Sequence, residues 1–383
     1  MLKMTSMQLK DHLSSESKFR SYDGNLENLL FGCELEYLIQ PSNNAKGIFR
    51  KTNIESLFNE LVRTKHYTKK HAGFEQRISK ETKSGFICIK PDFAYHVLEL
   101  SLPPRNSPAE LKELIKVTLE EVDEALDKFN FKRSRNSIVD EKSFEYEMID
   151  LDRHHQYLDF FKNKPLEARS LYFPDYPARV AALQIHLNIG GPKVFELLPG
   201  IYELEWIAAD LFSRSTTFQG IKYGCARNAI IDNTLGAKYA LKTIPTQIPR
   251  SANEYSALFN KTPHIFPNDV FFPAKDYTFV RPRHYRTLEF RSTCTQSSAE
   301  EILKVCAFRV LQVANSVKNS ANLSDGSGLE SRKSWLNKIG PSPQSSLNAF
   351  EEATISRAKS AWEEIPNKWK PYLEEAMAAV IAA

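Results

Sequence analysis

Four segments of the chain, residues 33–39, 98–102, 183–189 and 287–291, alternate apolar with polar side chains. Successive side chains of a strand point to opposite faces, so the polar members of each segment share one face. Those polar residues are Glu34, Glu36, Glu99, Gln184, His186, Asn188, Glu289 and Arg291. An antiparallel sheet with one face on the core and one wet face has this pattern.

The acidic character of this face indicates a bound cation. Carboxylates on neighbouring strands repel and raise one another's pKa unless a cation intervenes, so Glu34→Gln should leave the metal-free protein at least as stable. A set of carboxylates with Asp92 nearby and His186 as the single imidazole suits Mg²⁺ or Mn²⁺. The simpler alternative is that each polar face is exposed to solvent.

A carboxylate-bound Mg²⁺ commonly bridges substrate phosphates, so the pattern favours nucleotide chemistry. The sequence has no Walker A motif and no GxGxxG, and the phosphates would therefore be held by metal and arginine. Arg281, Arg283, Arg286 and Arg291 lie close together in the sequence, and at least one is expected to reach an anionic substrate.

Helices are predicted around these strands. Ser107 and Glu110 form a capping box before a long helix, and a second helix should begin near Ser298. Residues 318–349 should form loops around a short helix, and two further helices are expected at about 347–363 and 367–382. We expect this last part to be a helical region that packs on the main domain.

Composition excludes several classes. The 383 residues are 42% hydrophobic and 26% charged, an ordinary globular composition that allows one large domain or two. No apolar run predicts a secretion signal or a membrane span. Five cysteines without CxxC spacing suggest neither a disulfide framework nor a zinc site, which favours the cytoplasm. The net charge of +4 is too mild for nucleic acid, and the basic segment 63–83 is either a solvated face or a channel for an anionic substrate.

Several motifs together resemble the glutamate-cysteine ligase family, especially its shorter bacterial carboxylate-amine ligase branch. The similarity covers residues 30–295, in the family's order and spacing. The similar stretches are FGCELEY at 31–37, Asp92 with Glu99 and Pro103, IHLN at 185–188, FSRS at 212–215, FQG at 218–220, YGCAR at 223–227, Arg281-Pro282 and TLEFR at 287–291.

The resemblance implies an α+β fold with a curved, glutamine-synthetase-like antiparallel sheet, its concave face the active site, and flanking helices. The expected domains are a catalytic domain at 1–296 and a C-terminal helical region at 297–383. ATP with Mg²⁺ or Mn²⁺ would be the cofactors. The implied metal ligands are Glu34, Glu36, Asp92, Glu99, His186 and Glu289; the implied catalytic residues are Arg227 and Arg291; Asn188, Arg281 and Arg291 would bind the nucleotide.

We therefore predict an ATP-dependent ligase that joins the γ-carboxylate of glutamate to an amine through an acyl phosphate. Its partners would be small-molecule carboxylate and amine substrates, with no nucleic acid or membrane, and a homo-oligomer is left open. Two alternatives remain, a phosphotransferase on the same scaffold and a non-catalytic ATP-binding regulatory module. Gln184 stands where the bacterial branch often has histidine, and residues 103–180 match no part of the family pattern.

Overall fold

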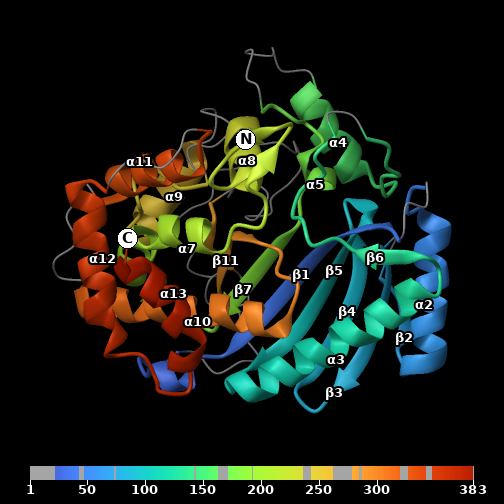
Figure 1. Ribbon diagram of the computed structural model, residues 1–383, viewed down its shortest axis with the longest axis horizontal. Coiled ribbons are helices and arrows are strands. Elements are labelled where there is room, and N and C mark those ends of the chain that lie inside the picture. Colours follow the sequence, from blue (N-terminus) through green and yellow to red (C-terminus); the bar gives the residue numbers. More distant parts are fainter. Residues whose placement is uncertain are drawn as a thin grey trace.

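The four alternating segments lie in one antiparallel sheet in the computed structural model (Figure 1), which describes residues 22–42, 47–72, 75–141, 144–162, 171–191, 193–235, 243–261, 278–283, 287–319, 327–341 and 347–382. The strands are β1 (Phe31–Pro41), β2 (Thr68–Ala72), β3 (Glu75–Thr82), β4 (Gly85–Asp92), β5 (Ala94–Arg105), β6 (Phe131–Arg133), β7 (Ala182–Leu187), β10 (Val280–Arg283) and β11 (Thr287–Cys294). Their order is β10-β11-β7-β1-β5-β4-β3-β2, and β6 pairs with β1.

The register of the strands brings the polar residues to the same side. Glu36 on β1 pairs with Glu99 on β5, and Glu34 pairs with Gln184 on β7. His186 pairs with Glu289 on β11. Since directly paired residues share a face, these side chains form one surface. We call it the polar face.

The opposite face of the sheet carries the apolar residues of the same strands and is covered by helices. Leu35, Leu98 and Leu100 are buried there. Figure 1 shows α3 (Pro108–Asp127) and α10 (Ala299–Asn319) across the sheet, with α2 (Lys51–Lys65) beside α3. Both predicted starts are confirmed, because Ser107 accepts from the Glu110 backbone N–H and Ser298 from that of Glu301.

Shorter elements connect the strands, and only some of them lie at the polar face. They are η1 (Leu26–Asn28), α4 (Asp152–Lys162), α5 (Tyr176–Arg179), α6 (Lys193–Glu203), α7 (Glu205–Leu211), β8 (Thr217–Phe218), β9 (Ile221–Lys222), α8 (Ala226–Leu235) and α9 (Ala252–Lys261). Of these, α5 and α8 supply side chains that line a cavity with Glu36. No helix among the described residues is long and apolar enough to cross a membrane.

The predicted C-terminal helices are present as α11 (Ser327–Ile339), α12 (Ala349–Trp362) and α13 (Lys370–Ala382). Helices α12 and α13 pack against α10, most of whose residues are buried, and α11 packs against α6, α7 and α8. Arg309 of α10 pairs with Glu205 at 2.9 Å, and both side chains are fully buried. Arg309 also donates to the Ser292 hydroxyl at 3.1 Å, which ties α10 to β11. The boundary between 1–296 and 297–383 stays a prediction.

Candidate functional site

The polar face is buried beneath the segments that cross it. Glu36, Glu99 and Glu289 expose 8%, 7% and 1% of their surface. Carboxylates are almost never buried to this degree unless they are paired or bound to a cation. The alternative that these residues simply face solvent is therefore wrong for these three.

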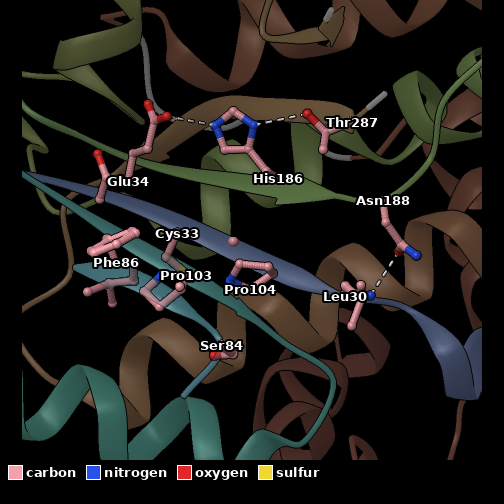
Figure 2. A pocket seen from close by; sticks show the side chains of 14 residues that line it. Leu30, Cys33, Glu34, Ser84, Phe86, Pro103, Pro104, His186, Asn188 and Thr287 are labelled. Atoms are coloured by element: carbon pink, nitrogen blue, oxygen red, sulfur yellow. Dashed lines mark hydrogen bonds and ion pairs between the residues drawn. The ribbon is translucent and has the colours of Figure 1, made fainter. Parts of the chain in front are cut away.

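Glu34, His186 and Glu289 form the tightest group on this face. One ligand atom from each lies within 4.8 Å of the others. His186 Nε2 lies 3.3 Å from Glu34 Oε1, and its Nδ1 lies 3.3 Å from the Thr287 hydroxyl (Figure 2). Nε2 is buried and makes no hydrogen bond of normal geometry. Two carboxylates and an imidazole nitrogen directed at one point are a donor set that fits Mg²⁺ or Mn²⁺.

Arginines surround Glu289. The Nε of Arg281 lies 2.5 Å from Glu289 Oε2, that of Arg283 lies 3.4 Å from the same oxygen, and that of Arg291 lies 3.6 Å from Oε1. Burial opposes ionisation, but Arg281, Arg283 and Arg291 together hold the pKa of Glu289 well below its usual value. Burial also raises the pKa of Glu34, but the charge of His186 outweighs it and the pKa of Glu34 is lowered. Glu34 in turn raises the pKa of His186.

Glu36 and Glu99 have raised pKa values, in contrast to Glu34 and Glu289. Burial and the neighbouring Asp92 raise the pKa of Glu36 to about 7, and Arg227 and Arg291 offset only part of that. The carboxylate of Glu36 accepts from the Ala182 backbone N–H at 2.9 Å and from the Gln184 amide.

Glu99 is paired across β5 and β4 with Lys90. Burial and the charge of Glu34 raise the pKa of Glu99 to about 8, although Lys90 opposes this. Lys90 Nζ lies 3.3 Å from Glu99 Oε2, and the Ser101 hydroxyl donates to Oε1 at 2.8 Å. Lys90 and Ser101 therefore offset only part of the effect of burial on this carboxyl.

A small cavity of about 100 Å³ lies beside Glu36 and Asp92. Arg227 and Arg291 reach it from α8 and β11, and Tyr176 reaches it from α5. Arg227 is 4% exposed, and its Nε has no hydrogen-bond partner. A buried guanidinium with an unused donor beside a cavity fits an anionic ligand such as a carboxylate or phosphate.

The loop before α8 is fixed by a close backbone approach. A Cβ at Gly224 would lie 1.5 Å from the carbonyl oxygen of Lys338 at the end of α11. No other residue fits there without moving the backbone. The C-terminal helix α11 therefore helps to set where α8, and with it Arg227, begins.

A larger cavity of about 610 Å³ opens on the side of Glu34 and His186 (Figure 2). Its opposite wall is largely apolar and includes Phe86, Pro103 and Pro104. Phe86 is 50% exposed, unusual for so large an apolar side chain. The volume lies in the range of about 300–1,000 Å³ that small-molecule sites occupy.

The remaining predicted residues have diverse surroundings. Asn188 lines the larger cavity, and its side-chain oxygen accepts from the Leu30 backbone N–H at 2.8 Å, which is a structural contact. His154 is buried against Phe93 and His155 pairs at the surface with Asp150, so the two do not form a ligand pair. Arg286 lies outside the described residues.

Sequence reasoning missed two polar residues of the site, Lys90 and Tyr176. Lys90 could have been found, because residues 86–90 alternate in the same way as the acidic strands and place it on the face of Phe86. Tyr176 lies on a four-residue helix inside the stretch without family similarity, and no periodic pattern marks it.

No protein-family model matches the sequence, and no curated protein matches it. Solved structures do. A bifunctional glutathione synthetase from Pasteurella multocida superposes with a TM-score of 0.60 and 13% identity, over 93% of this chain and 48% of that one. The glutamate-cysteine ligase of Francisella tularensis, solved in complex with AMP, gives a TM-score of 0.59 and 13% identity, over 94% of this chain and 83% of that one.

The chain therefore has the fold of these two proteins, and the predicted fold class is confirmed. It spans about half the length of the Pasteurella enzyme. At this identity the likeness extends to the fold alone, and the activity has to be argued from the site.

Proposed function

We propose that the protein is an ATP-dependent carboxylate-amine ligase, with the γ-carboxylate of glutamate as the expected donor. One observation carries the proposal. Buried carboxylates from β1, β5 and β11 meet His186 and a group of arginines between two cavities. The fold is that of a glutamate-cysteine ligase and a glutathione synthetase, whose names describe the same reaction class.

The two cavities suggest how the substrates divide. The larger cavity, with Phe86 on its apolar wall, suits a nucleotide base and sugar, and Glu34 and His186 line its other side. The smaller cavity, with Arg227, Arg291 and Tyr176, suits the organic substrates. The phosphoryl group would then pass between them, over the carboxylates.

In this reaction the donor carboxylate attacks the γ-phosphorus of ATP, which releases ADP and leaves an acyl phosphate. The amine then displaces phosphate. A divalent cation held by Glu34, His186 and Glu289, with Glu36, Asp92 and Glu99 beside it, would neutralise charge on the phosphates. Arg291 and Arg227 would orient the anionic groups, so that catalysis rests on position and electrostatics rather than on a protein nucleophile.

A panel of amino acids and amines, screened for ADP release with product masses read directly, tests the proposal. A donor labelled with ¹⁸O in its carboxylate should pass one labelled oxygen to the released phosphate, because the acyl phosphate breaks at the carbonyl carbon. A phosphotransferase would instead form a stable phosphorylated product without phosphate release.

The basic segment 63–83 gives little support to a regulatory module. Part of its charge is already paired within the chain, since Lys65 lies 2.5 Å from Glu124 and Lys80 lies 2.5 Å from Glu121. Turnover that survives neutralisation of Lys69 and Lys70 would fit the ligase, in which this segment has no catalytic role.

A further inference from the structure

Three charged side chains form a row across neighbouring strands of the polar face. Lys90 on β4 pairs with Glu99 on β5, and Glu99 pairs on its other side with Glu36 on β1. The Lys90 ammonium lies 3.3 Å from Glu99, and its side chain is 27% exposed, while that of Glu99 is 9% exposed. The ammonium is thus the more exposed end of this row of three side chains.

This ammonium compensates only part of the negative charge around it. Glu34, Glu36 and Asp92 all act on Glu99 in addition to Lys90. Around Glu289, by contrast, three guanidinium groups share one carboxylate. Arg227 and Arg291 balance part of the charge of Glu36, and His186 pairs with Glu34, but Lys90 is the cation paired with Glu99 itself. A further cation would therefore be favourable beside Glu99.

Lysine is also suited to a change of partner. Its ammonium is a point charge on a flexible stem, whereas a paired arginine is fixed by its planar fork. Phe86 and Lys90 project from the same side of β4 because they are four residues apart in a strand. Phe86 lines the larger cavity, and so does Ser101, whose hydroxyl donates to Glu99, so the Lys90–Glu99 pair lies next to a residue of that cavity.

We propose that Lys90 is a resident counter-ion of Glu99, which a divalent cation displaces and which then binds an anionic oxygen of the phosphate substrate. The proposal rests on the proposed function for the identity of the metal and the nucleotide. Lys90 would then contact the phosphates from β4, whereas Arg281 and Arg291 lie at the other end of the strand order, on β10 and β11.

The first test measures Mn²⁺ binding to the nucleotide-free protein by isothermal titration calorimetry. Lys90→Met removes the competing ammonium and should bind Mn²⁺ about fivefold more tightly, near the upper limit for an ion pair partly open to solvent. Lys80→Met is the matched control, because Lys80 is also 27% exposed and pairs with a buried glutamate, Glu121, away from the site. Lys80→Met should bind Mn²⁺ like the wild type.

A double-mutant cycle separates displacement from a general loss of positive charge. In a Glu99→Gln background Lys90→Met should no longer change Mn²⁺ affinity, because its partner is gone. Circular dichroism checks that each variant is folded, and Lys90→Gln replaces Lys90→Met if the latter is not. Equal or weaker Mn²⁺ binding in both Lys90 variants would overturn the proposal, and so would an unchanged effect in the Glu99→Gln background.

The second test measures the affinity for ATP at saturating Mg²⁺. Lys90→Met should weaken ATP binding about tenfold, and Lys80→Met should not change it. Unchanged ATP affinity in Lys90→Met would overturn the transfer to phosphate. If the wild type itself binds no ATP, the proposed function fails, while Mn²⁺ binding still decides whether Lys90 is displaced from Glu99. Absence of Mn²⁺ binding in the wild type would overturn both.

Discussion

Two groups of carboxylates share the polar face of one sheet, but their charges are balanced differently. Around Glu289 and Glu34 the cations belong to the protein, namely three arginines and His186, and both carboxyls have lowered pKa values. Around Glu36 and Glu99 the compensation is incomplete, and burial raises their pKa values to about 7 and about 8. The protein itself balances more of the charge of the first group than of the second, so an added cation should relieve more repulsion around Glu36 and Glu99.

Burial alone does not set the ionisation of these carboxylates. Glu289 is the most deeply buried of these carboxylates and is still the most acidic, because its partners were placed with it on β10 and β11. Glu99 is nearly as buried but faces other carboxylates.

The largest effect on stability is expected at Glu289. Glu289→Gln leaves three arginines beside a neutral side chain in a buried place, and should lower the free energy of unfolding by about 3–5 kcal/mol. Urea denaturation measures this. Glu330→Gln breaks an exposed ion pair with Lys333 and should cost less than about 1 kcal/mol. Similar small losses in the two variants would mean that the arginines do not depend on Glu289.

Arg291→Lys should reduce kcat/KM for ADP formation by about 10²-fold or more while the protein stays folded. Lysine keeps the charge but cannot make a planar two-point contact with phosphate or carboxylate. Steady-state kinetics on the substrate pair found in the screen measures the loss. Arg63→Lys is the control, because the Arg63 side chain is 69% exposed in its pair with Glu60. Near-normal kinetics in Arg291→Lys would make Arg291 a structural partner of Glu289.

The pH dependence of stability should differ between the two groups. A raised carboxyl pKa means that the folded protein holds its proton after the unfolded chain has lost it. The metal-free protein should therefore lose stability as pH rises from about 5 to about 8, the range between the usual glutamate value and those of Glu36 and Glu99. His186 adds to this decline, since its raised pKa favours the folded protein only while the imidazole is charged.

Glu99→Gln should make that decline shallower and gain about 1 kcal/mol at pH 8.5, with little change at pH 5.5. Chemical denaturation at both pH values in EDTA checks it, and Mg²⁺ should stabilise the wild type more than the variant. A variant that is destabilised equally at both pH values would show that Glu99 is a structural carboxylate.

The smallest effect concerns Glu34, where the structure reverses the sign expected from the sequence. Repulsion among carboxylates predicts that Glu34→Gln is neutral or stabilising. Glu34 instead pairs with His186, so the variant should lose about 0.5–1 kcal/mol at pH 6, where the imidazole is charged. Thermal melts should therefore show a lower melting temperature than wild type for Glu34→Gln at pH 6. They should show a higher melting temperature than wild type for Glu99→Gln at pH 8.5. A stabilised Glu34→Gln would restore the simpler expectation.

The sequence predicted the sheet because side-chain alternation has a period of two, and Glu34, Glu99, His186 and Glu289 each lie in a strand with that period. Capping residues likewise located α3 and α10. The pairing of charges could not be predicted, since it depends on which strands are neighbours. Whether Glu99 faces Lys90 or an arginine follows from the strand order, and no local pattern encodes that order.

In the proposed reaction the polar face uses a divalent cation to couple ATP cleavage to the joining of a carboxylate and an amine. ADP formation by the purified protein, measured with Mg²⁺ and with each organic substrate omitted in turn, decides whether it does. We predict ADP only when Mg²⁺ or Mn²⁺, the carboxylate and the amine are all present, and none after EDTA is added. Undiminished ADP formation in EDTA, or at the same rate without the carboxylate, would contradict the claim.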